Sequence, residues 1–268
     1  PDTFSMDLGE LEKLMTDKTR LVAFTHVSNI LGTINPVKAI TRFVHERGAM
    51  VCVDGVAYAP HRLIDVHDWD VDFYAFSLYK VYGPHYALLY GKQEHFEKLP
   101  GINHFFIDEV PYKIQPGNVN YELSYGLLGI TDSFRALFGA MQVNPTTGVQ
   151  NELGELFNMI ADHEETLTAK LLDYLLQKPG IHVIGDPTPD RNHRVSTISF
   201  IREGTQSSTV TQAVDRSKIG IRYGDFYARR LIDSLGLTKL DGVVRVSMVH
   251  YNTPGEVEKL IRALEDVL

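Results

Sequence analysis

The sequence predicts an α/β protein in which a mostly parallel sheet is followed by a smaller α+β domain. Three observations predict it. Continuous apolar runs alternate with helical segments in the first half, a long amphipathic segment follows, and shorter strands and helices alternate after it. Continuous apolar strands joined by helices are typical of a parallel sheet that is covered on both faces. We expect a large domain over residues 1–149, and a linking helix with a small domain over residues 150–268.

The elements of the first half follow from its apolar pattern. A short helix is expected over residues 8–15. Pro36 suits the first turn of a helix, and Gly48 ends that helix before the next strand. The expected strands are 21–26, 49–53, 71–76 and 87–90, and the expected helix between the first two is 37–46.

The second half is less regular at first and then changes style. Residues 94–145 are rich in Gly, Pro and Asn and show no clear period, whereas residues 150–176 have the spacing of a long amphipathic helix. Thr253 to Glu256 form a capping box with proline at the first helical position, which predicts the last helix. Between these, we expect strands 197–201, 219–222 and 243–248 and helices 208–216 and 228–235.

Composition limits the classes of partner and compartment. The chain of 268 residues has a formal net charge of −8, which argues against nucleic acid or an anionic membrane as the main partner. No apolar run is long enough to cross a bilayer. Cys52 is the one cysteine, so an internal disulfide is excluded and a reducing, cytoplasmic location is expected. Because the chain begins at Pro1, we expect it to be part of a longer protein.

Two polar residues at predicted strand ends suggest a particular chemistry. Lys80 follows one apolar strand, and Asp54 ends an earlier one. A lysine at the exit of a buried strand loses solvation, which lowers the pKa of its amine and favours the nucleophilic form. A carboxylate nearby can hold a proton on a pyridine nitrogen. A Schiff-base lysine and such an acid are the two anchors of pyridoxal phosphate (PLP). Taken alone, Lys80 is more often a solvated surface lysine, and Asp54 can be a turn residue at a strand end.

The position of three polar residues predicts a shared pocket. Asn29, Asp54 and Lys80 each follow an expected strand. Because ligands gather beyond the carboxyl ends of parallel strands, these side chains are expected to converge. His26 and His61 have no ligand-like cluster around them, so no metal site is expected.

A series of motifs extends this interpretation over nearly the whole chain. The motifs are residues 25–36, Val53-Asp54-Gly55, Ala59-Pro60-His61, Asp72-Phe73-Tyr74, the segment from Ser77 to Pro84, and Arg245-Val246-Ser247 followed by Tyr251-Asn252-Thr253. In this order they resemble class V aminotransferases, specifically the cysteine desulfurase and selenocysteine lyase group. Tyr79 stands where that group usually has histidine. The resemblance implies a PLP-dependent transferase of fold type I whose N-terminal part lies outside this chain.

The resemblance also implies roles for the cofactor residues. Lys80 would bind the cofactor as a Schiff base and later move the substrate proton. Asp54 would hold the proton of the ring nitrogen, and Ser77 would bind the cofactor phosphate, although a plain turn cap is the alternative for Ser77. Asn118 matches the residue that contacts the phosphate in the neighbouring subunit, so the resemblance implies a homodimer.

Three further residues are implied in substrate binding. Asn29 and Arg245 would bind the substrate carboxylate, since a guanidinium offers two parallel charge-assisted hydrogen bonds. Arg222 would support the same anionic region. Asn29 can also shape the turn before Gly32, and Arg222 can form a surface ion pair. For Arg245 in an apolar strand a purely structural role is harder to defend, because burying an unpaired guanidinium is costly.

Departures from the family pattern restrict the expected reaction. Tyr227 occupies the position of the loop cysteine that accepts sulfur in a cysteine desulfurase, and a phenol cannot form a persulfide. Cys52 lies in an expected core strand. Ala57 replaces a glutamine that contacts the phenolic oxygen of the cofactor, and Tyr79 is a candidate to compensate. No phosphate-binding loop or ring-stacking residue is found in residues 1–20.

The sequence therefore predicts a PLP-dependent enzyme acting on a small L-amino acid. β-Elimination, epimerisation or aminotransfer is favoured over persulfide transfer. Cysteine desulfuration by another route and a non-catalytic dimerising relative are the alternatives.

Overall fold

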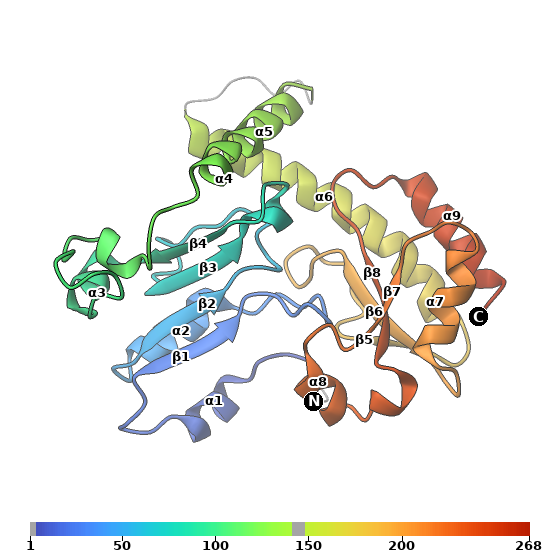
Figure 1. The fold of residues 1–268 in the computed structure, drawn as a ribbon. Helices are drawn as coiled ribbons and strands as arrows, with labels where there is room; N and C mark the ends of the chain where they lie inside the picture. Colours follow the sequence, from blue (N-terminus) through green and yellow to red (C-terminus); the bar gives the residue numbers. More distant parts are fainter. Residues whose placement is uncertain (1–3, 141–147) are drawn as a thin grey trace. The chain divides into compact units, whose positions relative to one another are not determined.

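The computed structural model describes residues 4–140 and 148–268 (Figure 1). The chain divides into two compact units. The unit that contains Lys80 comprises Leu8–His26 and Pro36–Leu156 and is called the lysine unit. The unit that contains Arg245 comprises the chain up to Asp7, Val27–Asn35 and Phe157–Leu268 and is called the arginine unit. The predicted domain division after residue 149 stays a prediction.

The lysine unit contains a four-stranded sheet in the order β1-β2-β3-β4 (Figure 1). The strands β1, β2 and β3 are parallel, and β4 is antiparallel to β3. All four predicted strands and the helix α2 are confirmed to within two residues. Their bounds are β1 Leu21–Thr25, α2 Val37–His45, β2 Met50–Asp54, β3 Phe73–Ser77 and β4 Ala87–Gly91, and the helix α1 spans Leu8–Leu14.

Helix α2 covers one face of this sheet. Its buried residues Val37, Ile40 and Val44 follow the i, i+3, i+7 spacing of an amphipathic helix. They form one core cluster with the fully buried side chains of Val51 and Val53 on β2. Cys52 between them is only half-buried and is a free thiol. The two faces of β2 are therefore unequal, and the face that α2 covers is the dry one.

A buried carboxylate joins α2, β2 and α3 (Gln93–Lys98). Asp72 is 4% exposed. It accepts hydrogen bonds from the backbone N–H of Val51 at 2.7 Å and lies 2.8 Å and 2.7 Å from Nε2 of His45 and of His95. Burial raises the pKa of Asp72, but the hydrogen bonds from His45, Val51 and His95 outweigh it, so the net pKa lies below its usual value.

The expectation of an irregular segment over residues 94–145 was wrong in part: residues 99–111 and 115–120 contain no helix or strand, as expected, and residues 141–145 lie outside the described residues. The structure has α3, a 3-10 turn at Tyr112–Ile114, α4 (Tyr121–Gly126) and α5 (Leu128–Ala140) there. Ile130 is the buried residue of α5, and several apolar side chains of this segment are exposed. Apolar residues on several faces of a helix hide its period, so the pattern gave no helical signal.

The arginine unit contains an antiparallel sheet in the order β5-β6-β8-β7 (Figure 1). The long helix α6 (Val149–Leu176) confirms the prediction, and its residues from Phe157 onward belong to this unit. Strand β5 was not predicted, and β7 begins three residues later than expected. The remaining bounds are β5 Ile181–Ile184, β6 Thr197–Arg202, α7 Ser207–Asp215, β7 Arg222–Gly224, α8 Arg229–Ser234, β8 Val243–Ser247 and α9 Pro254–Glu265.

The predicted start of the last helix is confirmed. Thr253 Oγ1 accepts the N–H of Glu256, and the Glu256 carboxylate accepts the N–H of Thr253, which completes a capping box. Within residues 4–140 and 148–268, no helix combines the length and the apolar character needed to cross a membrane.

The carboxylate of Asp72 makes stability depend on pH. Because its folded pKa is depressed, its contribution is complete well above the unfolded value of about 3.9 and is lost as the pH falls through the folded pKa. Asp72→Asn should lower the free energy of unfolding by about 2 kcal/mol at pH 7. Urea unfolding at pH 7 and pH 3 measures both values, and an equal difference between wild type and variant at the two pH values would contradict the assignment.

Candidate functional site

The lysine motif forms a short 3-10 turn at the end of β3. The turn spans Leu78–Val81, and the three-residue period places Leu78 and Val81 on one side, where both are buried. They pack with Ala59 and Ile130 in a core cluster. Tyr82 closes the turn with φ of 63°. The local fold is therefore set by the two apolar residues that flank Lys80, and Lys80 lies on the opposite side of the turn.

The expectation that Lys80 loses its solvation was wrong for this structure, in which the side chain is exposed. Its neighbour Tyr79 is also exposed and stacks on His85, with ring centroids 5.0 Å apart and planes 11° apart. The exposed amine is accessible to a ligand at the end of β3.

Asp54 and Ser77 are the last residues of the neighbouring strands β2 and β3, and their side chains lie on the same face of the lysine-unit sheet. Asp54 is paired in register with Ala75 on the parallel strand β3, and Ser77 is two residues further along. Because side chains alternate between faces along a strand, Asp54, Ala75 and Ser77 share one face. Asp54 is exposed, and its Oδ1 accepts the N–H of Val56 at 2.9 Å. Lys80 follows Ser77 by three residues. Asp54, Ser77 and Lys80 therefore all lie at the carboxyl ends of β2 and β3.

A compact aromatic cluster lies beside Asp54. The ring of His26 stacks on Tyr58, with centroids 3.6 Å apart and planes 8° apart, and meets the edge of Trp69 at 4.7 Å. His26 Nδ1 shares a hydrogen bond of 3.0 Å with the hydroxyl of Tyr74. A Cβ at Gly55 would lie 2.1 Å from the Tyr74 ring, so this position requires glycine. Sequence reasoning missed this cluster, because its members are far apart in the chain.

Burial controls ionisation in this cluster. Burial lowers the pKa of His26 to about 3, so the imidazole is neutral at physiological pH. Burial raises the pKa of Tyr58 to about 12, and it raises the pKa of Tyr74 further, with Tyr58 and Asp54 adding to the effect. The side chains of His26, Tyr58 and Tyr74 are therefore all neutral near pH 7.

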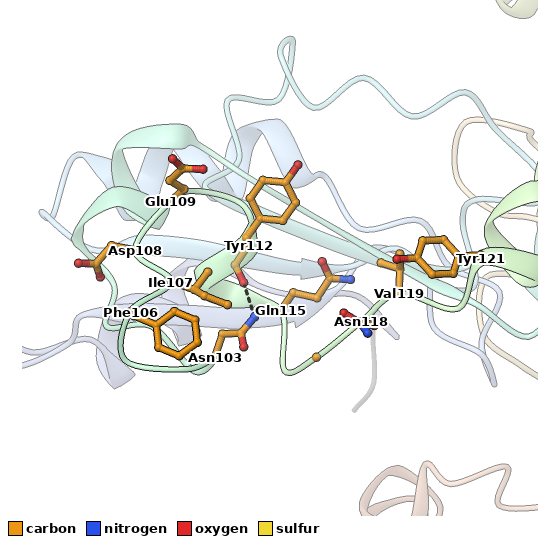
Figure 2. A pocket seen from close by; sticks show the side chains of 11 residues that line it. Asn103, Phe106, Ile107, Asp108, Glu109, Tyr112, Gln115, Asn118, Val119 and Tyr121 are labelled. Carbon is orange, nitrogen blue, oxygen red and sulfur yellow. Dashed lines mark hydrogen bonds between the residues drawn. The ribbon is translucent and has the colours of Figure 1, made fainter.

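Asn118 lies in a separate part of the lysine unit. It lines a cavity of about 450 Å³ formed by residues 103–121 (Figure 2). Phe106, Tyr112 and Tyr121 supply aromatic walls, and Asn103 donates a hydrogen bond of 3.1 Å to the carbonyl of Tyr112. Asp54, Ser77 and Lys80 do not line this cavity. The structure therefore does not bring Asn118 together with the lysine group of the same unit.

The predicted carboxylate-binding residues belong to the arginine unit. Arg245 on β8 donates from Nη1 to the backbone oxygen of Asn29 at 2.9 Å. Asn29 in turn donates from Nδ2 to the backbone oxygen of Phe226 at 2.7 Å. The Arg245 guanidinium carbon lies 3.7 Å from the centroid of the Phe226 ring. The structure thus brings Asn29 and Arg245 into direct contact, and Phe226, which sequence reasoning missed, contacts both of them.

The electrostatics of Arg245 are those of a half-buried cation. Burial lowers the pKa of its guanidinium. Its Nε is buried, and no hydrogen-bond partner for it lies in the described part of the chain. A ligand carboxylate is the group that would accept the hydrogen bond of this Nε.

Arg222 and Tyr227 flank this group. Arg222 is exposed at the start of β7, directly opposite Arg245 in the antiparallel register. Its Nη1 donates to the backbone oxygen of the preceding residue, Ile221. Tyr227 is fully exposed with φ of 65°, and the preceding Phe226 has φ of 49°. The loop between β7 and α8 thus contains two consecutive left-handed residues that are not glycine.

The donor set of the lysine unit fits PLP. It offers an exposed amine, an exposed carboxylate and a hydroxyl at the carboxyl ends of neighbouring strands, which are the groups that this cofactor requires. Among the described residues, no group of three or more His, Cys, Asp or Glu side chains is arranged to hold a metal ion.

Comparison with known proteins agrees with this arrangement. The chain is 48% identical to the aminotransferase-like protein FGM3 of Gibberella zeae over 98% of this chain and 63% of that protein. It is 36% identical to the cysteine desulfurase-like protein ustD of Aspergillus flavus over 100% of this chain and 59% of that protein. The cysteine desulfurase CsdA of Escherichia coli has the same fold, with a TM-score of 0.77 at 27% identity over 97% of this chain and 62% of that structure.

The chain spans about three fifths of the length of these relatives. Residues 2–122 and 139–260 match the sequence profile of the family described as aminotransferase class-V. This match covers most of both units, and two of the solved structures with this fold are cysteine desulfurases. The chain belongs to the class-V aminotransferase family, with the fold of PLP-dependent enzymes of fold type I.

Proposed function

We propose that the protein containing this chain is a PLP-dependent enzyme that acts on a small L-amino acid. The observation that carries the proposal is that Asp54, Ser77 and Lys80 lie together at the carboxyl ends of the parallel strands β2 and β3. When bound, the cofactor supplies an electron sink for the carbanion formed at the substrate Cα. Family membership supports this choice of cofactor and reaction class.

Each residue of the lysine unit has a defined task in the proposal. Lys80 Nζ holds the cofactor covalently and then moves the proton at the substrate Cα. Asp54 keeps a proton on the ring nitrogen, because an exposed carboxylate oxygen can accept that N–H. Ser77 Oγ donates to the cofactor phosphate. The neutral wall of His26, Tyr58 and Tyr74 excludes water without adding a competing acid or base.

The arginine unit supplies the substrate carboxylate site. Arg245 binds the carboxylate through Nε, which has no hydrogen-bond partner in the described part of the chain, and Asn29 is held beside it. Arg222, opposite Arg245 in the sheet, adds positive charge that favours an anionic ligand.

The reaction that we favour is β-elimination, epimerisation or aminotransfer. Desulfuration needs a thiolate that accepts sulfur, and Tyr227 is a phenol. Cys52 is a weak candidate for that role, since burial and then Asp54 raise the pKa of its thiol. The names of the relatives, aminotransferase-like and cysteine desulfurase-like, are compatible with several of these outcomes.

A second copy of the chain is the proposed partner. Exposed apolar side chains are concentrated in residues 99–128 of the lysine unit, the same segment that contains Asn118; they include Ile102, Phe105, Phe106, Tyr112, Tyr121 and Tyr125. Such a concentration on a surface is typical of an interface. We propose a homodimer in which this segment packs against the partner and Asn118 reaches the partner's phosphate site. A cytoplasmic location remains part of the proposal.

Lys80→Ala should abolish the visible absorption of covalently bound cofactor and reduce turnover by about 100-fold or more, because both the Schiff base and proton transfer are lost. Absorption spectra and single-turnover assays of the full-length protein measure the two effects. Lys98→Ala, which removes an exposed lysine of α3, is the matched control. Retention of the absorption band in Lys80→Ala would disprove the assignment. Failure of the wild-type protein to take up PLP would favour the non-catalytic alternative.

Product analysis with L-cysteine separates the reaction classes. Of the favoured reactions, β-elimination predicts sulfide with pyruvate and ammonia, since elimination releases sulfide and the resulting enamine is hydrolysed, whereas epimerisation and aminotransfer release no sulfide. L-Alanine with sulfide would mean that desulfuration occurs and that the argument from Tyr227 is wrong. Tyr227→Cys is the informative companion, because an introduced thiol that becomes a persulfide, detected by mass spectrometry, shows that the loop position alone decides this outcome.

Phe105→Asp should convert the dimer to monomer, because Phe105 is 95% exposed and a buried charge at an interface is costly. Light scattering during size-exclusion chromatography measures the mass. Leu14→Glu, at an exposed apolar residue of α1, is the control and should leave the mass unchanged. A monomeric wild type would rule out the proposed partner.

A further inference from the structure

The loop between β7 and α8 has an unusual backbone. Phe226 and Tyr227 have φ of 49° and 65°, and Gly224 before them has φ of 132°. The left-handed region is unfavourable for residues with a Cβ, so two in succession are retained only where the surroundings hold them. Asp225 supplies local support, because its Oδ1 accepts the N–H of Tyr227 and its backbone oxygen accepts that of Ala228.

This backbone sends the two aromatic side chains in different directions. Tyr227 is fully exposed, whereas Phe226 is half-buried and packs against the core cluster that contains Ile30 and Val243. The Phe226 ring lies over the guanidinium of Arg245 at 3.7 Å, within the range of a cation–π interaction.

Arg245, Asn29 and Phe226 each contact the other two. Arg245 donates to the Asn29 backbone, Asn29 donates to the Phe226 backbone, and the Phe226 ring stacks on Arg245. Ser199, opposite Arg245 on β6, donates its hydroxyl to the backbone of Ile30. The Asn29 backbone oxygen and the Phe226 ring therefore restrict the orientation of the guanidinium, and Ser199 anchors the segment next to Asn29.

The unpartnered donor of Arg245 indicates which kind of ligand this site can bind. Arg245 Nε is buried without a partner, and in the part of the chain that the structure describes no carboxylate forms an ion pair with Arg245. A guanidinium held flat by an aromatic ring keeps its edge for a planar anion.

We propose that Phe226 is a positioning residue for substrate binding, which orients Arg245 through its ring and Asn29 through its backbone oxygen and thereby selects ligands that carry an α-carboxylate. The loop of residues 224–228 serves this purpose in place of presenting a nucleophile. This inference rests on the proposed function, because it assumes that Arg245 binds the substrate carboxylate.

The stack itself is tested without the cofactor. Phe226→Leu removes the ring and keeps an apolar side chain, and Phe226→Tyr keeps the ring. We expect phenylglyoxal to modify Arg245 several-fold faster in Phe226→Leu, with no change in Phe226→Tyr, as followed by peptide mass spectrometry of the full-length protein. Exposed Arg222 is the internal control and should react equally in all three proteins. An unchanged rate at Arg245 in Phe226→Leu would overturn the proposal.

The selectivity is tested with two ligands that differ only in the carboxylate. Titration of the PLP-loaded full-length protein, followed by the absorption of the bound cofactor, gives dissociation constants for L-alanine and for ethylamine. Phe226→Leu should raise the dissociation constant of L-alanine by about fivefold to tenfold and leave that of ethylamine unchanged. Equal weakening of both ligands would mean that Phe226 only packs the core and would overturn the proposal. If the protein takes up no PLP, the proposed function fails, and the arginine modification still decides whether Phe226 holds Arg245.

Discussion

The parallel hydrogen bonding between β2 and β3 is the constraint on which the lysine unit depends. It pairs Asp54 with Ala75, and this register decides that Asp54 and Ser77 share a face and an edge. A slip of one residue would turn Asp54 toward the dry face that α2 covers. The buried valines of β2 prevent that slip, because it would expose them instead. Core packing and the placement of the acidic group are thus one and the same requirement.

Polar groups away from this edge are tied down by the same sheet. Asp72 precedes β3 and binds the start of β2, the end of α2 and α3 through hydrogen bonds. A buried carboxylate with this many donors holds its neighbours in one arrangement, since losing any donor leaves a charge poorly compensated. His26 and Tyr74 act similarly as a neutral pair. The rigid background leaves Asp54 and Lys80 as accessible ionisable groups at the edge.

The arginine unit solves a different physical problem, which is to keep a cation in an apolar strand. Arg245 is stacked on Phe226 and has one hydrogen bond to Asn29. The cost of burying its Nε without a partner is tolerable where a ligand carboxylate accepts that N–H. Backbone strain at Phe226 and Tyr227 is the local cost of placing the ring over the guanidinium. Strain and incomplete hydrogen bonding therefore meet at the same place, as they commonly do at functional sites.

The sequence by itself determined the elements with strong periodicity and the residues that carry motifs. The strands β1 to β4, the helices α2 and α6 and the capping box of α9 were predictable because local burial patterns and cap chemistry specify them. Helices α4 and α5 were not, since their apolar residues face several directions. Only the tertiary structure decided that Lys80 is exposed, that Asn118 lines a cavity apart from it, and that Phe226 contacts both Asn29 and Arg245. These facts depend on contacts between distant segments and on left-handed backbone at non-glycine residues, and neither leaves a periodic trace in the sequence.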